Sequence, residues 1–97
     1  MVLHTLSAGP DSSAFSDCLR VASADDAILL MGNGVYIAVE GTQPCSDLVA
    51  AKVKTFVLEA DARAAGITDR ISSLVSVVDF DRFVELSEQF PRQLAWY

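Results

Sequence analysis

Basic residues are few in this 97-residue sequence, and they form no cluster. Lysine and arginine together number 7, against 13 aspartates and glutamates, which gives a net charge of −6. The basic residues are spread along the chain, at Arg20, Lys52, Lys54, Arg63, Arg70, Arg82 and Arg92. Proteins that hold nucleic acid directly carry a basic patch on one face. The sequence therefore argues against direct nucleic-acid binding.

Long hydrophobic runs are also absent. No apolar stretch approaches the ~18–20 residues that a membrane-spanning helix needs. The first six residues, Met1-Val2-Leu3-His4-Thr5-Leu6, lack the basic segment and the long apolar core of a signal peptide. We therefore expect a cytoplasmic protein without membrane attachment. At this length we expect one domain, over residues 1–97.

Cysteine and histidine are scarce, with two cysteines, Cys18 and Cys45, and a single histidine, His4. In a reducing compartment both cysteines are expected to be free thiols. The spacing of these three residues matches no metal motif, and neither a catalytic triad nor a phosphate-binding loop is present. We therefore expect no metal and no cofactor, and we interpret His4 as a hydrogen-bonded core residue.

What the sequence does contain is an apolar run that ends in a turn. Residues Ala27 to Met31 follow two aspartates and lead directly into Gly32-Asn33-Gly34. A short run that is apolar on both faces is typical of a central strand in a parallel sheet, and sites tend to form at the carboxyl end of such strands. The turn could offer backbone N–H groups to an anion, although an ordinary turn is the simpler interpretation.

Two structures compete for the segment after this strand. Asn33-Gly34 between apolar runs is a strong hairpin signal, and residues 35–39 are rich in strand formers. The alternative is a short helix that opens at Gly34 and packs Tyr36 and Ile37 on the sheet. The residues alone leave this choice open.

The rest of the chain alternates between predicted strands and helices. Strands are expected at residues 2–6, 53–58 and 74–78. The first helix is expected to begin after Ser12 or Ser13, and a second is expected over residues 47–52 with Ser46 as its cap. A third is expected over residues 62–65, between the cap Asp61 and the terminating Gly66, and a fourth from Asp79 or Asp81 to Pro91. Strands that alternate with helices favour a parallel or mostly parallel sheet covered on both faces.

Each thiol has a structural and a functional interpretation. Cys18 shares an apolar helical face with Phe15, Leu19 and Ala22, which is typical of a buried side chain. A sulfur-carrying Cys18 would instead need partial exposure and a lowered pKa. Cys45 follows Pro44 in a polar loop, so we expect it to be an exposed thiol near the start of a helical turn.

Several short segments, taken in order, resemble the DsrH/TusB family of small sulfur-relay proteins. They include Leu3-His4-Thr5, Asp17-Cys18-Leu19, Leu29-Leu30, Gly34-Val35-Tyr36, Ala62-Arg63-Ala64-Ala65-Gly66, Ser76-Val77-Val78-Asp79-Phe80 and Gln93-Leu94-Ala95-Trp96. Their order and spacing carry the resemblance, which extends over essentially the whole chain. It implies an α/β fold, a three-layer α/β/α sandwich with a mostly parallel five-stranded sheet. In this fold residues 34–39 form a short helix and residues 94–96 the last strand.

The resemblance also implies a function. Family members are subunits of a cytoplasmic heterohexameric sulfurtransferase, in which each chain has two homologous partners of the DsrE/DsrF or TusD/TusC type. The complex relays persulfide sulfur between sulfur-carrier proteins. In TusB-type systems the sulfur is used for 2-thiolation of the tRNA wobble uridine, and in DsrH-type systems the relay serves sulfur oxidation.

Within this family the principal acceptor cysteine is expected on a partner subunit, which makes this chain an accessory, non-catalytic subunit. Cys18 matches the position of a cysteine in DsrH-type chains and is the candidate sulfur carrier, with a core role as the alternative. Cys45 matches no family cysteine. The isolated chain could form a homo-oligomer, and a stand-alone small-ligand-binding α/β module is the alternative function.

Overall fold

The computed structural model describes all residues, 1–97, and contains one five-stranded sheet. The strands are β1 (Val2–Leu6), β2 (Ala27–Leu30), β3 (Lys54–Leu58), β4 (Ser76–Val78) and β5 (Arg92–Trp96). They lie in the order β4-β3-β2-β1-β5, and every neighbouring pair is parallel. The expected α/β fold is confirmed, and the sheet is entirely parallel.

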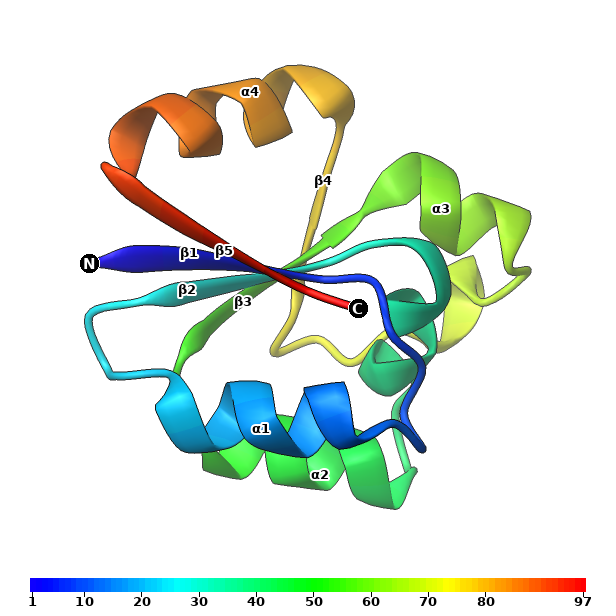
Figure 1. Ribbon diagram of the computed structural model, residues 1–97. Coiled ribbons are helices and arrows are strands. Elements are labelled where there is room, and N and C mark those ends of the chain that lie inside the picture. The colour runs from blue at the N-terminus through cyan, green and yellow to red at the C-terminus, as the bar shows by residue number, and fades with distance from the viewer.

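Helices cover both faces of this sheet. They are α1 (Ser13–Val21), α2 (Gln43–Ala50), α3 (Glu59–Ala64) and α4 (Phe80–Gln89), together with the 3-10 helices η1 (Gly32–Ala38) and η2 (Thr68–Arg70). α1 and α2 lie on one side of the sheet and α4 on the other (Figure 1). The strands from β1 to β4 are added in one direction, whereas α4 returns the chain to place β5 beside β1. Right-handed crossovers place a returning helix on the opposite face. No helix is both long and apolar enough to cross a membrane.

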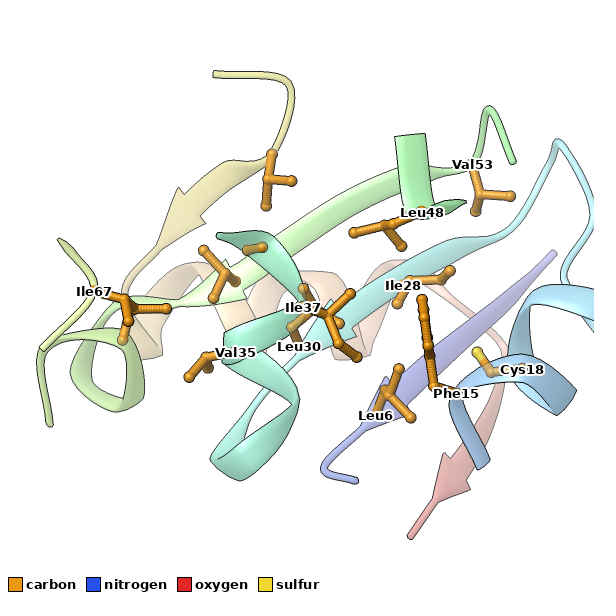
Figure 2. Close-up of a cluster of buried hydrophobic side chains, with 14 residues drawn as sticks. Leu6, Phe15, Cys18, Ile28, Leu30, Val35, Ile37, Leu48, Val53 and Ile67 are labelled. Atoms are coloured by element: carbon orange, nitrogen blue, oxygen red, sulfur yellow. The ribbon is translucent and has the colours of Figure 1, made fainter. Parts of the chain in front are cut away.

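Each face of the sheet has its own hydrophobic cluster. The larger cluster has 14 buried residues and lies beneath α1, α2 and η1 (Figure 2). The smaller has 6 residues, of which Leu86 comes from α4. Successive residues of β2 point to opposite faces, so Ile28 and Leu30 enter the larger cluster and Ala27 and Leu29 the smaller. All four are buried, as predicted for a central strand.

Two of the predicted helix caps are present. Ser12 caps α1 by accepting the backbone N–H of Phe15, and Asp79 caps α4 by accepting the N–H of Arg82. Gly66 follows α3 with a φ of +73°, which is the left-handed conformation expected there.

The other two predicted caps were wrong. α2 begins at Gln43 and is capped by Thr42, because Pro44 fits the first turn of a helix, where a backbone N–H is not needed. Ser46 therefore lies inside α2. α3 begins at Glu59, directly after β3, so Asp61 lies inside its first turn and bonds elsewhere.

The segment after β2 is the helix η1 and not a hairpin. It begins at Gly32, two residues earlier than expected, and buries Val35, Ile37 and Ala38 against the larger cluster. Tyr36, which we expected to pack on the sheet, points outward and is exposed. The structure thus agrees with the helix that the family resemblance implies.

Candidate functional site

Cys18 lies in the second turn of α1 with its sulfur directed into the larger cluster (Figure 2). Its exposed fraction is 0%. Burial, and to a lesser extent the negative charge of Asp26, raises the pKa of the Cys18 thiol to about 11. A thiol accepts sulfur as its thiolate. In this conformation Cys18 therefore has neither the access nor the ionisation that sulfur transfer needs, and its role as a carrier stays a prediction.

Cys45 is not the exposed loop thiol that the sequence suggested. Because α2 begins at Gln43, Cys45 lies in the first helical turn and faces inward, with an exposed fraction of 4%. It lies in the wall of a surface cavity of about 350 Å³ that Val49, Ser72 and Leu74 also line. Burial raises the pKa of the Cys45 thiol, and this outweighs a hydrogen bond with Ser72 that acts to lower it. Cys45 is therefore also a poor nucleophile in this conformation.

His4 joins two distant parts of the chain. Its Nε2 lies 2.9 Å from a carboxylate oxygen of Asp26, and the indole Nε1 of Trp96 lies 3.1 Å from its Nδ1. An indole nitrogen only donates, so Nδ1 is the acceptor and the imidazole proton on Nε2 is donated to Asp26. His4 is buried with both ring nitrogens satisfied, which confirms its interpretation as a hydrogen-bonded core residue.

Asp26 holds the amino ends of β1 and β2 together. Besides His4, its carboxylate accepts the backbone N–H groups of Val2 and Ser23, each at 2.9 Å. Burial acts to raise the pKa of Asp26, but these hydrogen bonds outweigh it and leave the pKa below its ordinary value. The sequence identified Asp26 only as a residue at a strand boundary. Its bonding partners could not be found from the sequence because they come from distant segments.

Two of the three backbone N–H groups in the Gly32-Asn33-Gly34 turn already have acceptors within the chain. The N–H of Gly32 donates to the carboxylate of Asp61 at 2.8 Å, and the N–H of Gly34 donates to the carbonyl of Met31 at 2.9 Å. A cavity of about 230 Å³ lies beside the turn, and Asp61 also lines it. Since a carboxylate of the chain already occupies the position of an anion, the interpretation as an ordinary turn is favoured.

The largest cavity, about 430 Å³, lies between α4 and the amino ends of the strands. Phe56, Leu86 and Phe90 supply apolar walls, and charged residues of both signs, including Lys54 and Asp25, line the remainder. No group of three or more His, Cys, Asp or Glu side chains in the molecule could hold a metal ion. Of the three cavities, only the one beside Cys45 contains a thiol, and that thiol has a raised pKa.

Known proteins resemble this chain over nearly its whole length. Residues 9–93 match the family described as DsrH like protein. Protein TusB from Pectobacterium parmentieri is 38% identical over 95 residues, which cover 98% of this chain and 100% of that protein. Protein TusB from Escherichia coli K12 is 37% identical over 95 residues, with the same coverage of 98% and 100%.

Two solved structures share the fold. The crystal structure of the ychN protein from E. coli superposes with a TM-score of 0.78, covering 98% of this chain and 97% of that one, at 17% identity. The solution structure of protein Tm0979 from Thermotoga maritima gives a TM-score of 0.70, covering 92% and 93% of the two chains, at 27% identity. At 17% identity, the likeness to ychN supports the fold alone.

Proposed function

The chain belongs to the DsrH/TusB family of sulfur-relay proteins, and on that premise we propose that it is a subunit of a cytoplasmic heterohexameric sulfurtransferase. Its partners are two homologous chains of the DsrE/DsrF or TusD/TusC type, and the complex relays persulfide sulfur between carrier proteins. The full-length match to proteins named TusB favours 2-thiolation of the tRNA wobble uridine as the destination of the sulfur. A DsrH-type role in sulfur oxidation is the alternative.

The observation that carries this proposal is the burial of both thiols. In persulfide transfer, an acceptor thiolate attacks the terminal sulfur of the donor persulfide, the S–S bond breaks, and the donor cysteine leaves as a thiolate. Cys18 and Cys45 are both buried and both have a raised pKa. This burial supports the proposal that the accepting cysteine lies on a partner subunit and that this chain is an accessory subunit of the assembly.

A sulfur-carrying Cys18 is the second form of the proposal. It is favoured by the match of Asp17-Cys18-Leu19 to the position of the DsrH-type cysteine. This form requires α1 to move away from the sheet when a partner or a carrier binds, so that the sulfur leaves the larger cluster. The requirement makes the two forms distinguishable by experiment.

The experiment combines the chain with its two partner subunits and a persulfidated carrier, and follows every chain by intact-protein mass spectrometry. Wild type, Cys18→Ala and Cys45→Ala are compared. We expect a partner subunit to gain one sulfur atom in all three samples, while this chain gains none. One sulfur on this chain that is lost only in Cys18→Ala would establish the second form. Failure of the chain to co-purify with two homologous subunits would contradict both forms of the proposal.

The pathway is tested separately in cells that lack this chain. The proposal predicts loss of 2-thiouridine from the tRNA wobble position, and recovery when wild type or Cys18→Ala is supplied. Unchanged 2-thiouridine, together with impaired sulfur oxidation, would assign the chain to the alternative pathway.

A further inference from the structure

β5 is paired on one side only. It pairs with β1 over its whole length, from Val2↔Arg92 to Leu6↔Trp96, and no strand lies beyond it in the sheet. Its first four residues are exposed and Trp96 is partly exposed. In Figure 1, β5 lies beside β1 at the edge of the sheet, and α1 contacts one face of it. Strands of parallel sheets are normally covered on both faces, so β5 departs from the rule that β2 follows.

The free edge of β5 also lacks the features that protect edge strands from pairing. In natural proteins, edge strands are kept from pairing with other chains because they are short, contain proline or lysine, or carry a β-bulge. β4, at the opposite edge, has 3 residues, whereas β5 has 5. Residues 92–96 contain neither proline nor lysine, and Arg92 is their only charged residue. This edge is therefore a template for a further strand.

One hydrogen bond determines which backbone groups of β5 are free. The N–H of Ser7, which follows β1, donates to the carbonyl of Trp96 at 3.1 Å, so the backbone groups of Trp96 face β1. In a parallel ladder the N–H and C=O of one residue face the same neighbour, and successive residues alternate. The backbone groups of Leu94 and Arg92 therefore also face β1. Those of Gln93 and Ala95 face away from the sheet and have no strand partner.

We propose that the free edge of β5 binds β5 of a second copy of this chain, with the two strands antiparallel. Such a contact is self-complementary about a two-fold axis. With Leu94 opposite Leu94, the free backbone groups of Gln93 in one copy meet those of Ala95 in the other. The two sheets then form one continuous sheet. This inference concerns the isolated chain and does not depend on the sulfur relay.

The charges and the positions of the β5 side chains favour a second copy of this chain as the partner that binds the free edge of β5. The side chains of Arg92, Leu94 and Trp96 lie on one face of β5, because alternate residues of a strand share a face. The same register places Arg92 of one copy beside the Trp96 ring of the other, where a cation–ring contact forms. Leu94, with an exposed fraction of 43%, meets its own copy. The chain carries a net charge of −6, yet residues 92–96 contain no acid, so this contact brings no acidic residues of the strands together.

The test is Ala95→Pro, compared with the matched variant Ala95→Ser. Proline removes the N–H of residue 95, which faces away from β1, so the pairing of β1 with β5 is kept. Serine keeps that N–H. By sedimentation equilibrium we expect wild type and Ala95→Ser to form dimers in the micromolar range, and Ala95→Pro to dissociate at least tenfold more readily. Arg92→Glu is expected to weaken the dimer as well, because it places an acid beside Trp96.

Several outcomes would overturn the proposal. One is a wild-type chain that stays monomeric up to about 100 µM, and another is a dimer that Ala95→Pro leaves unchanged. Loss of the dimer in Ala95→Ser would also contradict it, since serine retains the backbone donor. If Ala95→Pro fails to fold, amide exchange in wild type decides instead. The N–H groups of Gln93 and Ala95 gain protection with protein concentration if the edges pair, and show no concentration dependence if they do not.

Discussion

Gly34 lies so close to Leu6 that a β-carbon on residue 34 would be 2.2 Å from the Leu6 carbonyl oxygen. The same oxygen accepts the N–H of Met31 at 3.0 Å. The contact joins η1 to the carboxyl end of β1 and fixes the direction in which the chain leaves β2. Only glycine fits here, because backbone atoms cannot yield as a flexible side chain can. Gly34 is therefore a structural residue, and a substitution there cannot be used to test ligand binding.

Gly34→Ala is expected to lower the free energy of unfolding by about 2–4 kcal/mol, because η1 and β1 must separate to admit the methyl group. Urea denaturation followed by circular dichroism measures the change. Gly9→Ala is the matched control, since a β-carbon on Gly9 would meet nothing within 4 Å. Its effect should stay within about 0.5 kcal/mol. Equal effects of the two substitutions would disprove the close approach.

Trp96→Phe is expected to destabilise the chain by about 1–3 kcal/mol, because it removes the donor to the buried Nδ1 of His4 and leaves that acceptor unpaired. Tyr97→Phe is the control, since the Tyr97 side chain is 90% exposed and should tolerate the loss of its hydroxyl. Circular dichroism is the appropriate probe, because Trp96 is the only tryptophan. A Trp96→Phe variant as stable as Tyr97→Phe would show that the bond contributes nothing.

Asp26 makes the stability of the chain depend on pH. Its pKa is lower in the folded than in the unfolded chain, so its contribution is fully present above about 3.9, the unfolded value, and is lost as the pH falls through the folded pKa. Urea denaturation across about pH 3 to 7 should show stability falling at the acid end, and Asp26→Asn should flatten that dependence. Asp25→Asn, at the exposed neighbouring residue, should leave the pH dependence intact. If Asp25→Asn flattened the pH dependence and Asp26→Asn did not, the assignment of that dependence to Asp26 would be wrong.

Cys18 is expected to react slowly with thiol reagents in the folded chain. With its pKa raised from 9.0 to about 11, its thiolate fraction at pH 7.4 is about 100-fold smaller than that of an ordinary thiol, and burial slows the reaction further. The measurement uses Cys45→Ala, in which Cys18 is the only thiol, and compares its rates with and without denaturant. A folded chain that reacts as fast as the denatured one would show that the sulfur is accessible. Faster reaction only when the partner subunits are present would support the sulfur-carrying form of the proposal.

The alternation of strands and helices could be predicted from the residues, because local patterns determine it. The apolar run of β2, the apolar face of α1 and the caps at Ser12 and Asp79 each depend on residues within a few positions of one another. Their order along the chain, with the rule that crossovers are right-handed, restricts the arrangement of the layers. The family could also be identified from the sequence, because the order and spacing of short segments can be compared without any knowledge of contacts.

The tertiary structure decided the remaining features. Strand propensity in residues 35–39 amounts to about 1 kcal/mol, whereas burying Val35 and Ile37 contributes about 1.5–3 kcal/mol each, and in this fold η1 places both in the larger cluster. Cys45 is buried and not exposed as predicted, because α2 begins at Gln43, three residues before the predicted cap Ser46.

The bonds of His4 to Asp26 and Trp96 join residues 22 and 92 positions apart, and the free edge of β5 exists only because the chain returns past β1. Local sequence determines which elements form. Which thiols are buried and which edge stays open depend on contacts between distant segments, and these contacts are present only in the folded chain.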